Sequence, residues 1–304
     1  MRLAAVSVDL DEIPNYFAIH GLPAPAGPGS SAVYDVALER LESFARAHDL
    51  PLTLFAIGAD MARDASARGL RGMAERGHEI ANHSLDHLYD LTRRDAAEMR
   101  RQVASGITVL EGATGQRPVG FRAPGYTITD ALFRVLAELD VRYDSSVFPC
   151  PPYYLAKAAK LGAIRVAGRS SRSVLDRPSV LAAPVRPYRV GKPYWRRGGG
   201  LVELPIQVTR GPRLPFIGTT LTLAGAARAR WLTRLVVGEP LVNLELHGID
   251  VLDAADGLEG LRPHQPDVRV PAADKLSALG AVVETLKRAG YTFVRLREAA
   301  ERFG

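Results

Sequence analysis

Short apolar runs that alternate with helical patterns are the feature that most limits the folds open to this chain. Buried strands are expected at 3–9, 52–57, 78–83, 119–122, 141–144, 241–247 and 292–294. Helices with apolar positions at helical spacing are expected at 33–48, 61–76, 92–112, 130–139 and 273–289. This alternation predicts an α/β protein whose parallel βα units wind into a barrel or an open sheet. The residues at 14–30, rich in Pro and Gly, are expected to form a long surface loop.

The alternation is interrupted in the middle of the chain. Residues 148–220 hold many of the prolines, with only short strand-like runs at 179–182 and 201–208. Because the pattern resumes afterwards, we expect one catalytic domain over 1–304. The interrupted part, 148–240, is predicted to be an insertion within that domain and not a separately folding unit.

The composition is that of a globular protein with a basic balance. The 304 residues include 39 Lys and Arg against 33 Asp and Glu, a net charge of +6. No nucleic-acid-binding motif or aromatic–basic interleaving occurs, so nucleic acid is not an expected partner. The single cysteine, Cys150, cannot form an intrachain disulfide. No stretch approaches eighteen uninterrupted apolar residues, and the first apolar run is interpreted as a strand, so a cytoplasmic location is expected.

Residues with metal-binding chemistry gather at the expected strand ends. His83 and His87 lie four residues apart, so on a helical or tightly turned segment both imidazoles face one side. Asp9 and Asp11, two apart at the end of the first strand, also share a face. A histidine pair alone is a weak signal that chance can produce. The carboxylates matter because the ends of parallel strands meet at one edge of an α/β fold.

Five expected strand ends carry distinctive motifs. In order they are Asp9-Leu10-Asp11, His83-Ser84-Leu85-Asp86-His87, Arg122-Ala123-Pro124-Gly125-Tyr126, Asp144-Ser145-Ser146 and Leu246-His247-Gly248. Their order and content resemble the polysaccharide deacetylase family, also called carbohydrate esterase family four. The resemblance covers about 3–145 and 241–297 and implies a distorted barrel of about seven βα units. It also implies hydrolytic removal of an N-acyl group, acetyl foremost, from an amino sugar that is free, polymeric or carrier-linked.

A metal site and a base follow from this resemblance. Asp11, His83 and His87 would hold one divalent metal, with zinc expected and cobalt or nickel as alternatives. Asp9, beside the metal but not bound to it, would be the base that takes a proton from water.

The remaining motif residues would support the reaction. By resemblance Arg122 would pair with Asp9, and Asp144 would orient Arg122. The backbone N–H of Tyr126 would hold the oxyanion of the tetrahedral intermediate, and His247 would protonate the departing nitrogen. Arg122 and Asp144 could instead form a purely structural ion pair. His247 could be a satisfied core histidine.

Two departures from the common family pattern widen the range of substrates. Asp9 and Asp11 are separated by Leu10, where many members have adjacent aspartates, and the fourth motif lacks a tryptophan. The Asp-x-Asp form is similar to a branch that includes a deformylase of a lipid-linked amino sugar and cyclic-amide hydrolases, so both activities stay open. A non-catalytic sugar-binding module is the alternative from another class.

The stretch 212–238 mixes Phe, Trp and Leu with arginines and contains no acid. That composition is typical of a segment lying on anionic lipid, which would place the protein peripherally at the inner face of a membrane. The favoured interpretation is an amphipathic helix that covers the barrel with its arginines in solvent. The oligomeric state does not follow from the sequence.

Overall fold

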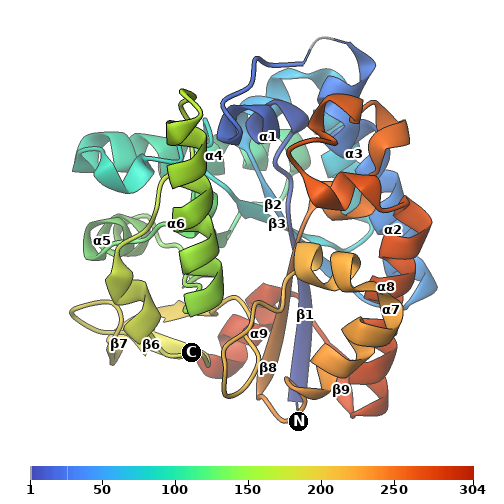
Figure 1. Ribbon diagram of the computed structural model, residues 1–304. Helices are drawn as coiled ribbons and strands as arrows, with labels where there is room; N and C mark the ends of the chain where they lie inside the picture. Colours follow the sequence, from blue (N-terminus) through green and yellow to red (C-terminus); the bar gives the residue numbers. More distant parts are fainter. Residues whose placement is uncertain (1, 26) are drawn as a thin grey trace.

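A nine-stranded sheet organises the computed structural model, which describes residues 2–25 and 27–304 (Figure 1). The strands are β1 (Arg2–Asp9), β2 (Leu52–Ala56), β3 (Glu79–Asn82), β4 (Gly120–Phe121), β5 (Tyr143–Asp144), β6 (Tyr188–Val190), β7 (Arg197–Glu203), β8 (Leu241–His247) and β9 (Tyr291–Phe293). Their order is β6-β7-β5-β4-β3-β2-β1-β8, and β9 pairs with β1. Every pairing is parallel except that of β6 with β7. The predicted α/β class, a distorted barrel-like sheet of parallel βα units, is confirmed.

Helices flank and connect these strands. They are α1 (Ile13–Ile19), α2 (Leu38–Ala47), α3 (Asp64–Glu75), α4 (Ala96–Thr114), α5 (Asp130–Glu138), α6 (Pro151–Val166), α7 (Gly218–Arg234), α8 (Ala272–Arg288) and α9 (Leu296–Phe303). A π-helical turn at Val33–Ala37 leads into α2. Short 3-10 turns occur at Pro28–Ser31, Gly58–Ala62, Leu91–Arg93, Pro124–Tyr126, Pro178–Ala182, Gly248–Val251, Ala254–Asp256, Glu259–Leu261 and Pro266–Arg269. None of the helices in the described residues is long and apolar enough to cross a membrane.

The structure differs from the expected local structure in three places, and in each of them a 3-10 or α-helical segment has proline in its first turn. Part of the loop expected at 14–30 is α1, whose first N–H, that of Ile13, donates to the Glu12 carboxylate at 3.1 Å; residue 26 of that loop lies outside the described residues. Helix α6, inside the predicted insertion, starts with two prolines and was missed. The strand-like run at 179–182 is a 3-10 turn that follows Pro178. Proline suits the first turn of a helix because its missing N–H would be unsatisfied there anyway.

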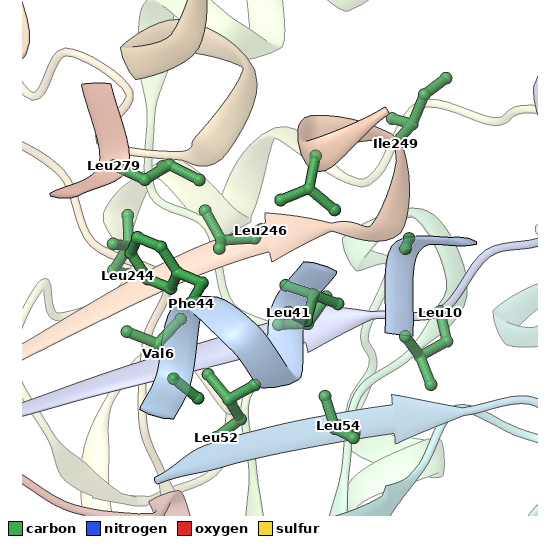
Figure 2. Close-up of a cluster of buried hydrophobic side chains, with 14 of the residues drawn as sticks. Val6, Leu10, Leu41, Phe44, Leu52, Leu54, Leu244, Leu246, Ile249 and Leu279 are labelled. Carbon is green, nitrogen blue, oxygen red and sulfur yellow. The ribbon is translucent and has the colours of Figure 1, made fainter. Parts of the chain in front are cut away.

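The two faces of the central strands differ in chemistry. On one face Val6, Leu244 and Leu246 pack with residues of α2 and α8, among them Leu41, Phe44 and Leu279 (Figure 2). Because successive strand residues point to opposite faces, the other face of β1 and β8 carries Ser7, Asp9, Asn243, Glu245 and His247. Asp9 and His247 are register partners at the ends of β1 and β8. The apolar face therefore forms the core, and the polar face points into the curl of the sheet.

Parts of the predicted insertion belong to this framework. Strand β7 pairs in parallel with β5, and the segment after it reaches β8, where the Gln207 N–H donates to the Asn243 carbonyl at 3.2 Å. The chain at 204–208 thus links the two ends of the parallel sheet. A single domain with an insertion at 148–240 remains a prediction, although β7 is an integral strand.

The 212–238 segment forms α7, which packs along α8 and against β8. Leu221 and Ala229 are fully buried in the main core, while Arg228, Arg230 and Trp231 are exposed. The position of α7 therefore agrees with the favoured interpretation, an amphipathic helix that covers the barrel with its arginines in solvent. Contact of this segment with a membrane remains a prediction.

Candidate active site

The three predicted metal ligands come together at the carboxyl ends of β1 and β3. Asp11 lies two residues beyond β1, and His83 and His87 lie on the turn that follows β3. Asp11 Oδ1 is 3.3 Å from His83 Nε2 and 3.1 Å from His87 Nε2. All three side chains are buried, and one ligand atom of each lies within 4.8 Å of the others.

The polar atoms of this cluster are arranged as the ligands of a cation would be. Asp11 Oδ1 and both ring nitrogens of His87 are buried without a hydrogen-bond partner among the described residues. Such atoms are costly unless they are satisfied. His83 Nδ1 donates a hydrogen bond to the Arg122 carbonyl oxygen at 2.7 Å, so the other ring nitrogen, Nε2, is the one that faces Asp11. Two imidazoles and one carboxylate therefore fit a divalent ion such as zinc, cobalt or nickel.

A strained turn, and not a helix, brings the two histidines together. Ser84 and His87 have φ values of 70° and 51°, a left-handed conformation that is uncommon outside glycine. The His87 N–H donates to Ser84 Oγ at 3.1 Å and closes the turn. Each such residue costs about 1–3 kcal/mol, and strain of this kind concentrates at functional sites.

The neighbouring histidines favour the ionised form of Asp11. Burial raises the pKa of Asp11, but the neighbouring His87 and His83 imidazoles outweigh it and bring that pKa well below its usual range. Burial lowers the pKa of His83, but Asp9 and Asp11 raise it by more. Asp11 is therefore a carboxylate, the form in which it can bind a cation.

The predicted pair of Arg122 and Asp9 is present and deeply buried. Arg122 Nη1 lies 2.6 Å from Asp9 Oδ1, and neither side chain is more than 1% exposed. The other guanidinium nitrogens donate to the Ser145 carbonyl at 2.8 Å and to the hydroxyls of Ser7 and Ser145, each at 2.9 Å. The Arg122 guanidinium also stacks 4.1 Å from the centre of the Phe55 ring. Asp9 is thus held in one orientation beside the cluster of Asp11, His83 and His87, with Asp9 Oδ2 3.8 Å from His83 Nε2.

The orienting role expected of Asp144 falls to other residues. Asp144 accepts hydrogen bonds from the Ser146 N–H at 2.9 Å and the Ser146 hydroxyl at 2.8 Å, and it faces Glu203 across β5 and β7. Among the described residues, the donors of Arg122 go to Asp9, Ser7 and Ser145 and none to Asp144. Asp144 therefore holds Ser146 in the loop after β5. Ser146 Oγ in turn accepts the N–H of Ala123, in the loop after β4, at 2.8 Å, so the two loops are joined.

The backbone of Tyr126 does not fit the expected oxyanion role in this conformation. Its N–H donates to the Ala123 carbonyl at 3.0 Å inside the 3-10 turn, so it is not free for a substrate oxygen. The side chain of Tyr126 is at the site instead, with its hydroxyl 3.4 Å from His247 Nε2. That hydroxyl is a polar group which sequence reasoning did not assign to the site.

His247 occupies the place expected for the acid, and a buried carboxylate supports it. His247 Nε2 lies 4.0 Å from Asp11 Oδ2, and its side chain is 22% exposed. On its other side, Nδ1 lies 2.9 Å from Glu245 Oε1, and Glu245 is fully buried. Burial lowers the pKa of His247, but the Glu245 carboxylate raises it by more, to well above its usual value. The spacing of Glu245 and His247, two apart on one strand, is the sequence signal for this pair.

Aromatic side chains surround the cluster and limit its exposure. Tyr89 packs edge-on against His87, with ring centres 4.6 Å apart. Tyr16 and Tyr126 lie 6.3 and 6.0 Å from the His247 ring, and Tyr153 of α6 lies 6.1 Å from Tyr126. The more exposed His247 side chain, and not the cluster of candidate metal ligands, is therefore the part of the site that meets solvent.

Fold and side chains together describe a barrel-like α/β protein with a candidate metal site at the carboxyl ends of its strands. Residues 29–143 match the polysaccharide deacetylase family. The resemblance predicted from the sequence motifs is thereby confirmed, while membership of an Asp-x-Asp branch remains a prediction.

Two curated proteins are similar to parts of the chain. A peptidoglycan deacetylase-like protein of Gibberella zeae is 36% identical over 77 residues, covering 25% of this chain and 22% of that protein. A chitooligosaccharide deacetylase of Bradyrhizobium is 36% identical over 78 residues, covering 25% of this chain and 34% of that protein. The chain thus spans about a third or less of the length of these relatives.

Solved structures share the fold over nearly the whole chain. A protein of Mycobacterium smegmatis grouped with the polysaccharide deacetylases has a TM-score of 0.54 and 20% identity, covering 96% of this chain and 92% of its own. A family four pseudoenzyme of Bacillus anthracis has a TM-score of 0.50 and 14% identity, covering 98% of this chain and 65% of its own. Since a pseudoenzyme shares the fold, an assignment of activity must come from the side chains of this protein.

Proposed function

We propose that this protein is a metal-dependent hydrolase that removes an N-acyl group, acetyl foremost, from an amino sugar. The observation that carries the proposal is the cluster of Asp11, His83 and His87, with Asp9 on one side and His247 on the other. Within the described residues, Asp11 Oδ1 and both ring nitrogens of His87 lack hydrogen-bond partners. Amide hydrolysis needs a base for water and an acid for the departing nitrogen, and the site offers one candidate for each.

Each residue of the site has a definite task in this proposal. Asp11, His83 and His87 would hold a divalent ion, which would act as a Lewis acid toward the amide carbonyl and toward water. Asp9, fixed by Arg122, takes the proton from water. His247, kept protonated by Glu245, gives a proton to the leaving nitrogen. The Tyr126 hydroxyl, 3.4 Å from His247 Nε2, is placed to orient that ring or the substrate.

The enclosure of the site favours a terminal or single sugar over the interior of a polymer. The metal cluster is buried, and Tyr16, Tyr89 and Tyr126 stand around it with at most 9% of each exposed. A long polysaccharide would need an open groove on both sides of the scissile amide. We therefore propose a free or carrier-linked amino sugar as the substrate.

The test combines metal analysis with an acyl-release assay on free, polymeric, nucleotide-linked and lipid-linked N-acylated amino sugars. We expect about one divalent ion per chain and release of acetate from a free or carrier-linked sugar. Asp11→Ala and His87→Ala should each lose the ion and activity. His48→Ala, which alters a histidine between α2 and α8, is the matched control and should keep both.

Three outcomes would contradict the proposal in different ways. Full activity after chelation would reject the metal assignment. A protein that binds the ion and sugars but releases no acyl group from any substrate would be a sugar-binding module, and turnover of a ring amide would make it a cyclic-amide hydrolase.

A further inference from the structure

Helix α6 differs from the other helices in what it exposes. Ile164 is its only fully buried residue, whereas Leu155 and Val166 are 67% and 90% exposed, the two most exposed large hydrophobic side chains of the described residues. Figure 1 shows α6 standing in front of the sheet at the outside of the molecule. Exposing two large apolar side chains on one helix is unfavourable in water unless something covers them.

Four exposed apolar residues of α6, which include its two large ones, form a line. Leu155, Ala159, Gly162 and Val166 are all exposed and are spaced by four, three and four residues. That spacing puts them on one side of an α-helix. We call this line the α6 stripe.

Positive charge flanks the α6 stripe without any acid nearby in sequence. Between residues 145 and 175 the chain has five cationic residues and no acidic one; the five are Lys157, Lys160, Arg165, Arg169 and Arg172. Among the described residues none of the five forms an ion pair, and the two lysines donate to the backbone carbonyls of Gly125 and His264. The charge of the three arginines is therefore available to an anionic partner.

A groove beside the helix concentrates part of that charge. It has a volume of about 680 Å³, and its lining includes Arg93, Arg165, Arg169, Ser170 and Ser171. Guanidinium and hydroxyl donors in one hollow suit the oxygens of a phosphate group. An apolar line next to a phosphate-binding hollow is the combination that a phospholipid surface requires.

We propose that α6 docks the protein on an anionic lipid surface, with the α6 stripe in the acyl boundary and the arginine groove on lipid phosphates. Helix α7, whose composition first suggested lipid contact, is less suited. Its apolar side is covered by α8 and β8, and the backbone at Gly225 breaks its helical path. Its exposed hydrophobic residues are Leu223 and Trp231, at 45% and 56%.

The docked helix would bring the candidate active site to the lipid surface. Tyr153, in the first turn of α6, packs on Tyr126, whose hydroxyl lies 3.4 Å from His247 Nε2. Lys157 Nζ ties the helix to the Gly125 carbonyl at 3.0 Å. If the proposed hydrolase activity holds, on which this step rests, the substrate class is an N-acylated amino sugar carried by a lipid.

Vesicle co-sedimentation of the whole chain tests the docking without any assay of activity. We expect binding to phosphatidylcholine vesicles that contain phosphatidylglycerol, little binding to phosphatidylcholine alone, and weaker binding at high salt. Leu155→Ser with Val166→Ser, and separately Arg165→Ala with Arg169→Ala, should each lower the partition coefficient about tenfold or more. Leu223→Ser with Trp231→Ser on α7 is the matched control and should bind as the unmodified protein does.

Several results would overturn the docking proposal. They are equal binding to both vesicle types, no binding, or loss of binding only in the α7 variant. A dimer in solution that the Leu155 and Val166 changes dissociate would show that a second copy covers the stripe instead. Unchanged thermal unfolding establishes that the variants fold. Acetate release from a free sugar, measured on the same proteins, separates failure of the docking from failure of the proposed hydrolase.

Discussion

Arg122 is the residue of the site that requires the most hydrogen-bond partners. A fully buried guanidinium is tolerable only when its donors are satisfied, and this one is shared between a carboxylate, a carbonyl and two hydroxyls. Burial lowers the pKa of Arg122, but the charge of Asp9 raises it by more, so the side chain stays cationic. A planar fork with donors in fixed directions can meet all these partners at once, whereas an ammonium group cannot.

Replacing Arg122 by Lys should therefore damage catalysis while leaving the metal ligands in place. We expect kcat to fall about 10–100-fold, because Asp9 loses the partner that fixes its orientation. The metal content should stay near that of the unmodified protein. Arg117→Lys, at an exposed ion pair with Glu111, is the control and should change neither quantity. A variant with unchanged kcat would show that Arg122 only stabilises the fold.

At the scale of the elements, β5 and β7 place two carboxyl groups opposite each other. Asp144 and Glu203 are register partners, and both are fully buried. Burial, followed by the charge of Asp144, raises the pKa of Glu203 well above its usual value. The fold therefore favours the protonated form of Glu203, whose Oε1 also accepts the Val147 N–H at 3.0 Å.

This pair should make stability depend on pH in a defined direction. The pKa of Glu203 is higher in the folded protein than in the unfolded chain, where it is about 4.3. The stabilisation that Glu203 gives is therefore complete below pH ~4.3 and is lost as the pH rises through the folded pKa. Glu203→Gln keeps the acceptor for Val147 and cannot ionise. Its Tm should fall less between mildly acidic and alkaline pH than that of the unmodified protein, by about 2 °C or more.

Thermal unfolding at a series of pH values measures this difference. The control is Glu111→Gln, which changes an exposed carboxylate and should leave the pH dependence as it is. If the Glu203→Gln variant loses Tm with rising pH as steeply as the unmodified protein, the buried pair is not the cause.

The same elements show what local sequence patterns can predict. Strands β1, β2 and β8 and helices α4, α5 and α8 were predicted because their apolar periodicity is long and regular. In the structure, the side chains of Asp95 and Thr129 cap α4 and α5. Helices α1 and α6 have a less regular apolar periodicity and prolines in their first turns. Prolines in a sequence usually indicate a loop, so both helices were missed. Helix α9, at the end of the chain, was not predicted either.

For the whole molecule, the main core joins β1, β2 and β8 to helices α2 and α8 (Figure 2). Leu244, in the middle of β8, is 1% exposed and lies one residue before Glu245. Leu244→Ala should lower the free energy of unfolding by about 2–5 kcal/mol through lost burial and the cavity left behind. Chemical denaturation measures this change, and Leu223→Ala, on the exposed side of α7, should cost about 0.5 kcal/mol or less.

The whole site was only partly predictable, because its contacts join distant strands. Asp11, His83, His87 and His247 could be named from the ends of expected strands. Ser7 and Ser145 could not be named as partners of Arg122, since that requires knowing that β1, β4 and β5 curl toward one another. For the same reason the contact of Asp144 with Glu203 could not be foreseen, because the strand-like run at 201–208 was assigned to the insertion and not to the sheet.

The alternation along β1 and β8 has a further consequence. Val6 and Val8 belong to the core, and the residues between and after them, Ser7 and Asp9, belong to the site. A slip of one residue in this strand would put carboxylates into the apolar layer and valines beside the metal ligands. The strand register that buries Val6 and Val8 in the core therefore also places the Asp9 carboxylate at the site.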